Sequence, residues 1–261
     1  MPGLQLQASR TERLQRSPLE LVVCQLRHER NLAVADAKRA LAVHAGLEEQ
    51  YPSIDEAANM ALNILGGPAG VSTAADQQRG WNFRSTDGNW TVVLMPEFFA
   101  LQTRAYRDWD DFSARLAALV GLVDEVLEPS LEQRLGLRFI DRITEPKMST
   151  PADWKGWIDD HLLGPILHQA FGPAIKSIQQ VVQFDGGDDV EVILRHGCLL
   201  EGQPVDQAWH YLLDHDCSRS RARPFSADAV RDGVQGLHEL ALSVFQTAVT
   251  PQLYERLLGD S

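Results

Sequence analysis

The chain has 261 residues and a net charge of −12, from 36 Asp and Glu residues against 24 Lys and Arg residues. Its composition, 44% hydrophobic and 23% charged, is typical of a globular protein and excludes wholesale disorder, and the acidic balance makes nucleic acid an unfavourable partner. No stretch reaches the roughly 18 uninterrupted apolar residues of a membrane helix and the polar N-terminus lacks the apolar region of a signal peptide, so we expect a cytoplasmic protein with no membrane partner.

Strands and helices are predicted to alternate in the N-terminal half. Residues 1–17 are expected to form a disordered polar tail. The apolar, β-branched run at 19–26 follows Pro18 and predicts a strand. The stretch at 34–51 is rich in Ala, Leu, Lys and Glu, which predicts a helix that Pro52 ends.

A hairpin, a strand and a helix complete this half. Asp87-Gly88 separates two β-rich runs, which predicts a β-hairpin, and a third strand is expected at 98–106. Asp108 is expected to cap the next helix, whose apolar residues recur at three- and four-residue steps until Pro129. This apolar stripe consists of Phe112, Leu116, Leu119, Val123 and Val126.

The same order of elements begins again in the C-terminal half. A strand is predicted at 134–144, a helix at 153–171, a second hairpin around 185–187 and a further strand at 208–217. A long helix is predicted to begin at Ser226. Its apolar stripe consists of Val230, Val234, Leu237, Ala241, Val244 and Ala248.

This repeated order predicts an internal duplication of a strand-helix-three-strand-helix unit. We expect an α+β fold in which antiparallel sheets pack with helices, because each sheet has one apolar face to bury. The expected halves are residues 18–130 and 131–261, packed as one globular unit.

Three arginines in the predicted strand at 134–144 stand out in an acidic chain. Side chains alternate between the faces of a strand, so Arg134, Arg138 and Arg142 share one face, while Asp141 is an exception on the apolar face. Neighbouring arginines stand about 13 Å apart at about 3.3 Å per residue, which is too far for a single phosphate. A larger anion, an acidic peptide segment or several separate carboxylates fit this spacing better. The three arginines are therefore candidates for binding a partner or an anion.

The predicted strand at 208–217 supplies carboxylates that could meet these arginines. Alternation puts His210, Asp214 and Asp216 on its polar face, so the two aspartates can pair with the arginines if the strands lie close together. Three interpretations stay open: a structural lattice of salt bridges, which we favour, a site for an anion or acidic partner, and a cleft between the halves in which one aspartate acts beside His210.

Motifs for catalysis and metal binding are missing from the sequence. H-E-x-x-H, G-x-S-x-G and Walker A patterns do not occur, and the glycine-rich stretch at 66–70 is interpreted as a connector. Adjacent residues of a strand point to opposite faces, so the His and Asp residues of 208–217 cannot converge on one metal. Cys24, Cys198 and Cys217 lie far apart, which is typical of a reducing compartment. We assign no catalytic residue, no metal and no cofactor.

Four segments in order carry a resemblance to a known family. They are SPLELVVCQLR, WNFRSTDGNWTVVLMPEFFALQTRAYRDWDDF, RLGLRFIDRI and YLLDHD. Together they resemble a sporadically distributed bacterial family of uncharacterised proteins, over about residues 17 to 258, in which W-x-F-x-S-x-D-G-x-W, R-x-G-L-R-F/Y-I and Y-L-L-D-x-D segments occur. Phe139 and Asp141 stand where Tyr and Asn are frequent in that family. The resemblance implies no reaction and no catalytic residue.

These observations favour a non-enzymatic binding or regulatory protein that recognises a protein partner. The scattered distribution of the family suits an accessory role in a bacterial defence, toxin-neutralising or biosynthetic system. The alternative is a small-molecule-binding protein or an enzyme with its site in a cleft between the two halves. A homo-oligomer is compatible with either hypothesis.

Overall fold

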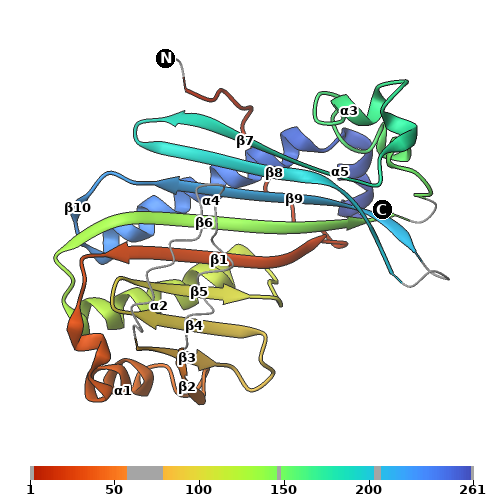
Figure 1. Cartoon of the computed structure of the whole chain (residues 1–261). Coiled ribbons are helices and arrows are strands. Elements are labelled where there is room, and N and C mark those ends of the chain that lie inside the picture. The colour runs from red at the N-terminus through yellow and green to blue at the C-terminus, as the bar shows by residue number, and fades with distance from the viewer. Residues whose placement is uncertain (1–2, 58–78, 146–147, 203–206, 260–261) are drawn as a thin grey trace. The chain divides into compact units, whose positions relative to one another are not determined.

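The computed structural model describes residues 3–57, 79–145, 148–202 and 207–259. These residues form an α+β fold with antiparallel strands and packed helices, which confirms the α+β class that was predicted (Figure 1). The glycine-rich stretch at 66–70 lies outside the described residues. Within the described part of the chain, no helix has the length and apolar character to cross a membrane.

Two compact units make up the chain, and each combines segments that are distant in sequence. Unit 1 comprises Met1–Val22, Leu137–Arg219 and Gln235–Ser261, and unit 2 comprises Val23–Gly136 and Ser220–Val234. Strands β1 and β6 and helix α4 each contribute residues to both units.

Unit 2 contains the strand order β2-β3-β4-β5-β1-β6, and β10 pairs with β6. The strands of this order are β1 (Leu19–His28), β2 (Ser53–Ala57), β3 (Gly80–Arg84), β4 (Trp90–Met95), β5 (Phe98–Thr103), β6 (Leu131–Thr144) and β10 (Arg223–Pro224). Among the described residues of unit 2, the complete helices are the 3₁₀ helix η1 (Leu32–Ala35), α1 (Ala37–Ala45) and α2 (Trp109–Leu127).

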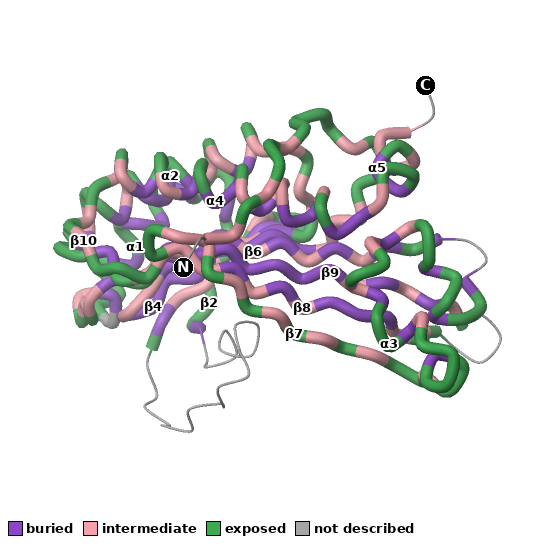
Figure 2. Tube along the Cα trace, turned by 90° about the horizontal axis from the view of Figure 1, so that it is seen from above, coloured by how far each residue is buried: buried purple, intermediate pink, exposed green. Residues whose placement is uncertain are grey.

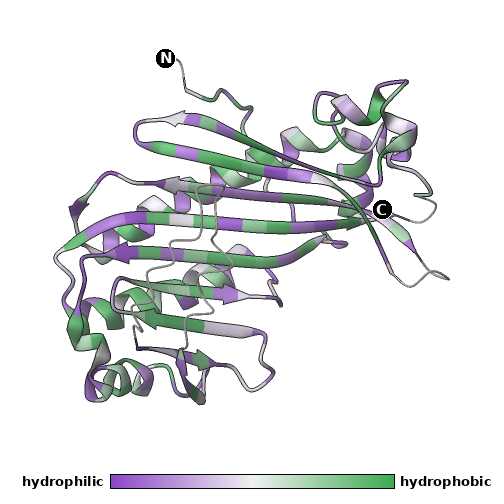
Figure 3. Ribbon diagram, viewed as in Figure 1, coloured by the Kyte–Doolittle hydropathy of each residue, from purple (hydrophilic) through white to green (hydrophobic). Residues whose placement is uncertain are grey.

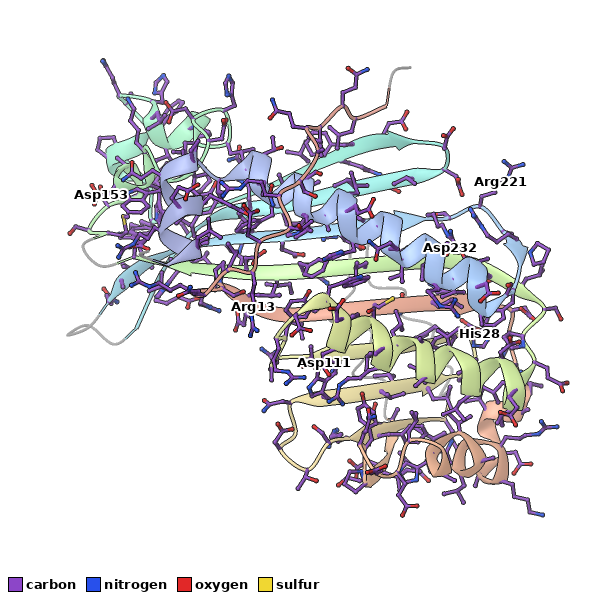
Figure 4. The ribbon with its side chains drawn as sticks, turned by 180° about the vertical axis from the view of Figure 1, so that it is seen from behind. Arg13, His28, Asp111, Asp153, Arg221 and Asp232 are labelled. Atoms are coloured by element: carbon purple, nitrogen blue, oxygen red, sulfur yellow. The ribbon has the colours of Figure 1, made fainter. Side chains whose placement is uncertain are left out.

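The predicted hairpin at Asp87-Gly88 and the predicted helix after Asp108 are confirmed. Gly88 has a φ of 71°, which glycine adopts without strain, and β3 and β4 pair antiparallel on either side. Helix α2 packs the ring of Phe112 against Trp90 of β4, with 5.9 Å between centroids. Asp111, labelled on α2 in Figure 4, holds the guanidinium of Arg115 at 3.0 Å, and this guanidinium lies over the Trp90 ring.

The prediction for residues 34–51 is only partly right. Asp36 accepts a hydrogen bond from Lys38 N and begins α1, which ends at Ala45, because the backbone N–H of Gly46 turns back to His44 O. Strand β2, which pairs with β3, was not predicted. Its burial pattern has one buried residue in five, so the apolar alternation that marks a strand is weak.

Asp108→Ala is expected to lower the free energy of unfolding by about 1 kcal/mol. The Asp108 carboxylate accepts a hydrogen bond of 2.9 Å from the N–H of Asp111, which has no partner within the helix. Asp124→Ala on the same helix is the control, because Asp124 is exposed near the C-terminal end and should cost nothing. Urea unfolding followed by circular dichroism compares the two, and an equal effect would contradict the role of the cap.

Unit 1 contains the strand order β6-β9-β8-β7 together with the first residues of β1. Its other elements are β7 (Ser177–Gly187), β8 (Val190–Glu201), β9 (Ala208–Arg219), α3 (Gly164–Leu167), α5 (Pro251–Leu258) and the 3₁₀ helices η3 (Pro151–Trp154) and η4 (Gly172–Ala174). Helix α4 (Ala227–Ala248) enters this unit at Gln235. The separate helix α5 was not predicted; it begins after Thr250, whose hydroxyl accepts from Leu253 N.

The predicted helix at 153–171 is wrong. Gly156 has a φ of 83°, outside the helical region, and Pro165 lacks the N–H that a helix interior requires. The stretch therefore forms the two short helices η3 and α3, which bury Trp154 and Ile166. The composition favoured a helix, but these backbone constraints override it.

The second hairpin is confirmed, although its turn lies further along the chain than predicted. Gly187 pairs with Val190, so Asp188 and Asp189 form the two-residue turn. Both have positive φ, 47° and 68°, which matches the twist of a type I′ hairpin. A register shift between Asp185 and Gly187 adds one residue to β7 and explains the displacement.

Residues 3–17, expected to belong to a disordered polar tail, form no helix or strand but make specific hydrogen bonds in unit 1. Leu4 N donates to Asp185 O at 2.7 Å, and Arg16 N donates to Leu257 O at 2.9 Å. Arg10 pairs with Glu255 at 2.7 Å and lies over the ring of Tyr254. This segment therefore contacts β7 at one end and α5 at the other.

Candidate functional site

The two faces of β6 in unit 1 differ as the sequence predicts. Residues of one parity, including Leu137, Phe139 and Ile143, are buried, whereas Arg138 and Arg142 on the other parity are partly exposed. Figure 3 shows this alternation as hydrophobic and hydrophilic bands along the strand. We call the polar side of β6, β9 and β8 in unit 1 the charged face; its members are Arg138, Arg142, Arg195, Asp214 and Asp216.

Arg138 and Asp214 form a bidentate, largely buried ion pair on this face. Nε of Arg138 donates to Oδ1 at 2.7 Å and Nη2 donates to Oδ2 at 2.6 Å, a bidentate geometry. The side chains are only 13% and 6% exposed. Burial alone would lower the pKa of the Arg138 guanidinium, but hydrogen bonds and charge from Asp214, with the charge of Asp216, raise it. The prediction that Asp214 pairs with one of the arginines is therefore confirmed.

A second arginine approaches the same carboxylate. Strand pairing places Arg195 of β8 opposite Asp214 of β9, and its Nη1 lies 3.7 Å from Oδ2. This nitrogen is buried and donates no hydrogen bond to any described residue. Asp214 thus lies between two guanidinium groups, and Asp216, two residues along the same face, contributes further negative charge.

Arg142 pairs with carboxylates from two other segments. Its Nε lies 3.1 Å from Oε2 of Glu20 on β1, and its Nη1 contacts Glu201 on β8. All three side chains are between a third and two-fifths exposed, so this is a solvent-screened cluster. Asp214 and Asp216, the partners predicted for the arginines, form no ion pair with Arg142.

Two further predicted site residues, Arg134 and His210, are not part of the ion pair between Arg138 and Asp214. Arg134 belongs to unit 2 and folds along its own strand over Gly136. His210 places Nδ1 2.8 Å from Oγ1 of Thr144 in an exposed position. Four residues separate it from Asp214 along β9, or about 13 Å, so the two side chains do not converge.

The arginines of the charged face pair with carboxylates of the same chain. Two of the three arginines proposed for binding an anion hold carboxylates of the same protein, and a foreign anion would have to displace them. Within the described ranges, no three His, Cys, Asp or Glu side chains gather in a way that could hold a metal ion. The geometry therefore favours a structural lattice over an anion site.

The opposite, buried face contains a pair that the sequence reasoning missed. Asp141 of β6 and His215 of β9 are 4% and 2% exposed, with Oδ2 and Nδ1 3.8 Å apart. Neither atom has a hydrogen-bond partner among the described residues. The His215 ring stacks on the ring of Phe139, with 5.5 Å between the ring centroids. His215 lies an even number of positions from Tyr211 and Leu213 on the same strand. The sequence pattern therefore indicated that its side chain shares their apolar face.

Burial keeps both members of this pair uncharged near neutral pH. Burial raises the pKa of Asp141 to about 8, and the negative charge of Asp214 contributes to this rise. Burial lowers the pKa of His215 to about 4, against the opposing effect of Asp214. His238 of α4, whose ring lies 6.2 Å from Phe139, also has its pKa lowered to about 4 by burial. Three titratable groups thus lie buried between the strands and α4.

The cysteines are buried single thiols. Cys24, Cys198 and Cys217 form no disulfide. Burial raises the pKa of Cys198 to about 11 and that of Cys217 further, so neither exists as the reactive thiolate at neutral pH.

The outermost strand of unit 1, β7, differs from β6 and β9 in exposure. None of its residues is buried, and every second residue from Ser177 to Asp185 is exposed, as Figure 2 shows. Val181, at its centre, is 52% exposed. The sequence reasoning identified this strand but not its position at the end of the strand order, which depends on pairing between distant segments.

No protein-family model matches the chain, and no curated protein matches it.

Proposed function

We propose that this protein is a non-enzymatic binding protein that recognises a protein partner, and that the partner adds a strand to the outer edge of β7. The observation that carries this proposal is the position of β7 at the end of the strand order, with one edge pairing with β8 and the other with no strand among the described residues. Unpaired backbone N–H and C=O groups along such an edge are a template for another strand.

The composition of β7 supports this role. Strands in proteins are usually about 5–6 residues long, whereas β7 spans 11. Edge strands are commonly protected by charged residues, proline or short length. The stretch from Ile178 to Phe184 contains no charge and no proline, and the only register shift lies beyond it, between Asp185 and Gly187. The usual obstacles to strand addition are therefore missing.

Backbone hydrogen bonds identify the residues of β7 whose N–H and C=O groups point away from β8. The carbonyl of Asp185 accepts a hydrogen bond from Leu4 N, so the segment that contains Leu4 already bonds to this edge at one end. Residues of the same parity, Gln179, Val181 and Gln183, direct their backbone groups the same way. No described segment forms a backbone hydrogen bond with these three residues on that side.

Val181→Lys is expected to abolish partner binding, because a lysine on an edge strand opposes strand addition. Leu41→Lys on α1 is the matched control, since Leu41 is 50% exposed and lies in unit 2. Both variants would be purified gently from the organism that makes the protein and studied by native mass spectrometry beside the wild type. We expect an added mass of protein size with the wild type and the control, and its loss with Val181→Lys.

An unchanged complex in the Val181→Lys variant would contradict the β7 edge. The arginine hypothesis is tested in the same experiment with Arg142→Ala, which alters the exposed part of the charged face without changing β7. Loss of the partner in that variant alone would assign binding to the arginines instead.

We also propose that the two halves arose by internal duplication. Two strand orders support it: β5, β4 and β3 follow β1 as β9, β8 and β7 follow β6. Each set is succeeded in the chain by a long helix, α2 or α4. An experimental structure in which 19–128 and 134–257 fail to superpose would contradict the duplication.

A further inference from the structure

We infer that the strand added to β7 is the β7 strand of a second copy of this chain, paired antiparallel about a twofold axis at Val181. This inference rests on the proposed use of the β7 edge. A twofold interface requires one surface to be complementary to itself, so each residue of the strand must suit the residue that the axis places opposite it.

In this register, the residues whose backbone N–H and C=O groups point away from β8 lie opposite residues of similar chemistry. Val181 faces Val181 of the second copy, and Gln179 faces Gln183, each pair exchanging two N–H···O=C bonds. Val181, now 52% exposed, would bury against its equivalent, flanked by glutamine amides that can hydrogen-bond across the strands.

On the other face the outer pairs are apolar, whereas the inner pairs place Val182 opposite Gln180, whose Nε2 already donates to Leu162 O at 3.1 Å. Ile178 faces Phe184 and Gln180 faces Val182, and all four are partly exposed in the single chain. Pairing thus adds apolar contact on both faces of the strand. The bond between Leu4 N and Asp185 O lies beyond the Gln179–Gln183 register and can persist.

Charge at the ends of β7 favours the antiparallel direction. Asp185 and the turn residues Asp188 and Asp189 lie at one end, and Lys176 precedes the other. Antiparallel pairing brings the acidic turn of one copy beside Lys176 and Ser177 of the other, whereas a parallel arrangement would bring two acidic turns together.

Net charge gives the association a distinctive salt dependence. Each copy carries a charge of −12, so two copies repel each other at long range. Salt screens this repulsion, and dimerisation is expected to strengthen between about 0.02 and 0.3 M salt. A basic partner protein would show the opposite trend.

The register is tested by cysteine cross-linking of the full chain. In Val181→Cys the two new thiols would lie on residues whose Cα atoms are about 5.5 Å apart, within disulfide range. In Gln183→Cys, the matched control, the equivalent residues are four positions apart, about 13 Å, and cannot bridge. Mild oxidation should give a covalent dimer of the first variant only. Cross-linking of both to the same extent, or of neither, would overturn the register.

The association itself is tested by sedimentation velocity on the wild type and Val181→Pro. Proline removes an outward N–H that β8 does not use, so the fold should be retained, as circular dichroism would verify. We expect the wild type to have twice the monomer mass at micromolar concentration and the variant to be monomeric.

A wild-type chain that stays monomeric at every concentration would overturn the second copy as occupant. The proposed function would survive that result if native mass spectrometry still found a different protein lost in Val181→Lys. A dimer that persists in Val181→Pro would overturn the β7 interface.

Discussion

Arg138→Met is expected to lower the free energy of unfolding by about 3 kcal/mol. The variant leaves the Asp214 carboxylate, 6% exposed, without its bidentate partner, and Arg195 at 3.7 Å replaces only part of the interaction. Removing one member of a buried ion pair is costly because the other charge remains desolvated. Urea unfolding monitored by circular dichroism measures the loss.

Arg142→Met provides the matched control for Arg138→Met. Both arginines lie on the same face of β6, but Arg142 and its partners Glu20 and Glu201 are at least a third exposed. Exposed pairs contribute about 0–1 kcal/mol, so the control should lose no more than that. A similar loss in both variants would show that burial of the Arg138 pair does not decide its contribution.

The double variant Arg138→Met with Asp214→Leu is expected to regain at least half of the lost stability. Apolar residues of similar volume often replace a buried ion pair at little cost, and the charge that remains, the Arg195 guanidinium, is 18% exposed and loses only a contact of 3.7 Å. A double variant as unstable as Arg138→Met alone would contradict the recovery and assign the loss to poor packing of the methionine or to the Arg195 guanidinium, which then lacks Asp214. The cycle thus separates the desolvated carboxylate from the shape of the side chain.

Asp141→Asn is expected to abolish a fall in stability between pH 6.5 and 8. The pKa of Asp141 is raised from 3.8 to about 8 in the folded protein, so in this window the folded state binds a proton that the unfolded state has released. Stability of the wild type therefore declines as pH rises, by up to about 1.4 kcal/mol per pH unit. The variant cannot ionise at this position and loses the slope.

The histidines give the opposite slope at lower pH. Between pH 4 and 6.5 the unfolded state protonates His215 and His238, which stay neutral when folded, while Asp141 stays protonated only when folded. From these three groups the unfolded state binds one more proton, and His28 and His196, whose pKa values burial also lowers, act in the same direction, so stability rises with pH in this window. We expect a maximum near pH 6.5 in the wild type.

Urea unfolding at a series of pH values tests both windows. Asp124→Asn, an exposed site on α2, serves as the control and should leave the fall above pH 6.5 unchanged. A wild-type profile that is flat from pH 6.5 to 8 would contradict the raised pKa of Asp141. A slope that persists in Asp141→Asn would assign it to another group.

Local patterns predicted much of the fold. The Asp87-Gly88 hairpin, the Asp108 cap and the apolar stripes of α2 and α4 were recognisable because each depends on residues a few positions apart. The helix expected at 153–171 failed at Gly156 and Pro165, where backbone conformation outweighs composition. The alternation along β6 placed Arg138 and Asp141 on opposite faces correctly.

The partners of those residues could not be read in the same way. Asp214 was a candidate for Arg138 by alternation alone, but Glu20 and Glu201 were not foreseen for Arg142, because they lie on strands whose neighbours the sequence does not specify. The Asp141–His215 pair required knowing that β9 lies beside β6. These contacts join residues more than 50 positions apart.

The amino-acid sequence predicts the periodicity of α2 and α4, the acidic charge and the two faces of β6 correctly, because each follows from short-range geometry and composition. Tertiary structure alone decided which strands are neighbours, which charges are buried, and that β7 stands at an edge. Those properties depend on pairing between distant segments, and the same alternating pattern is compatible with a central or an outer strand.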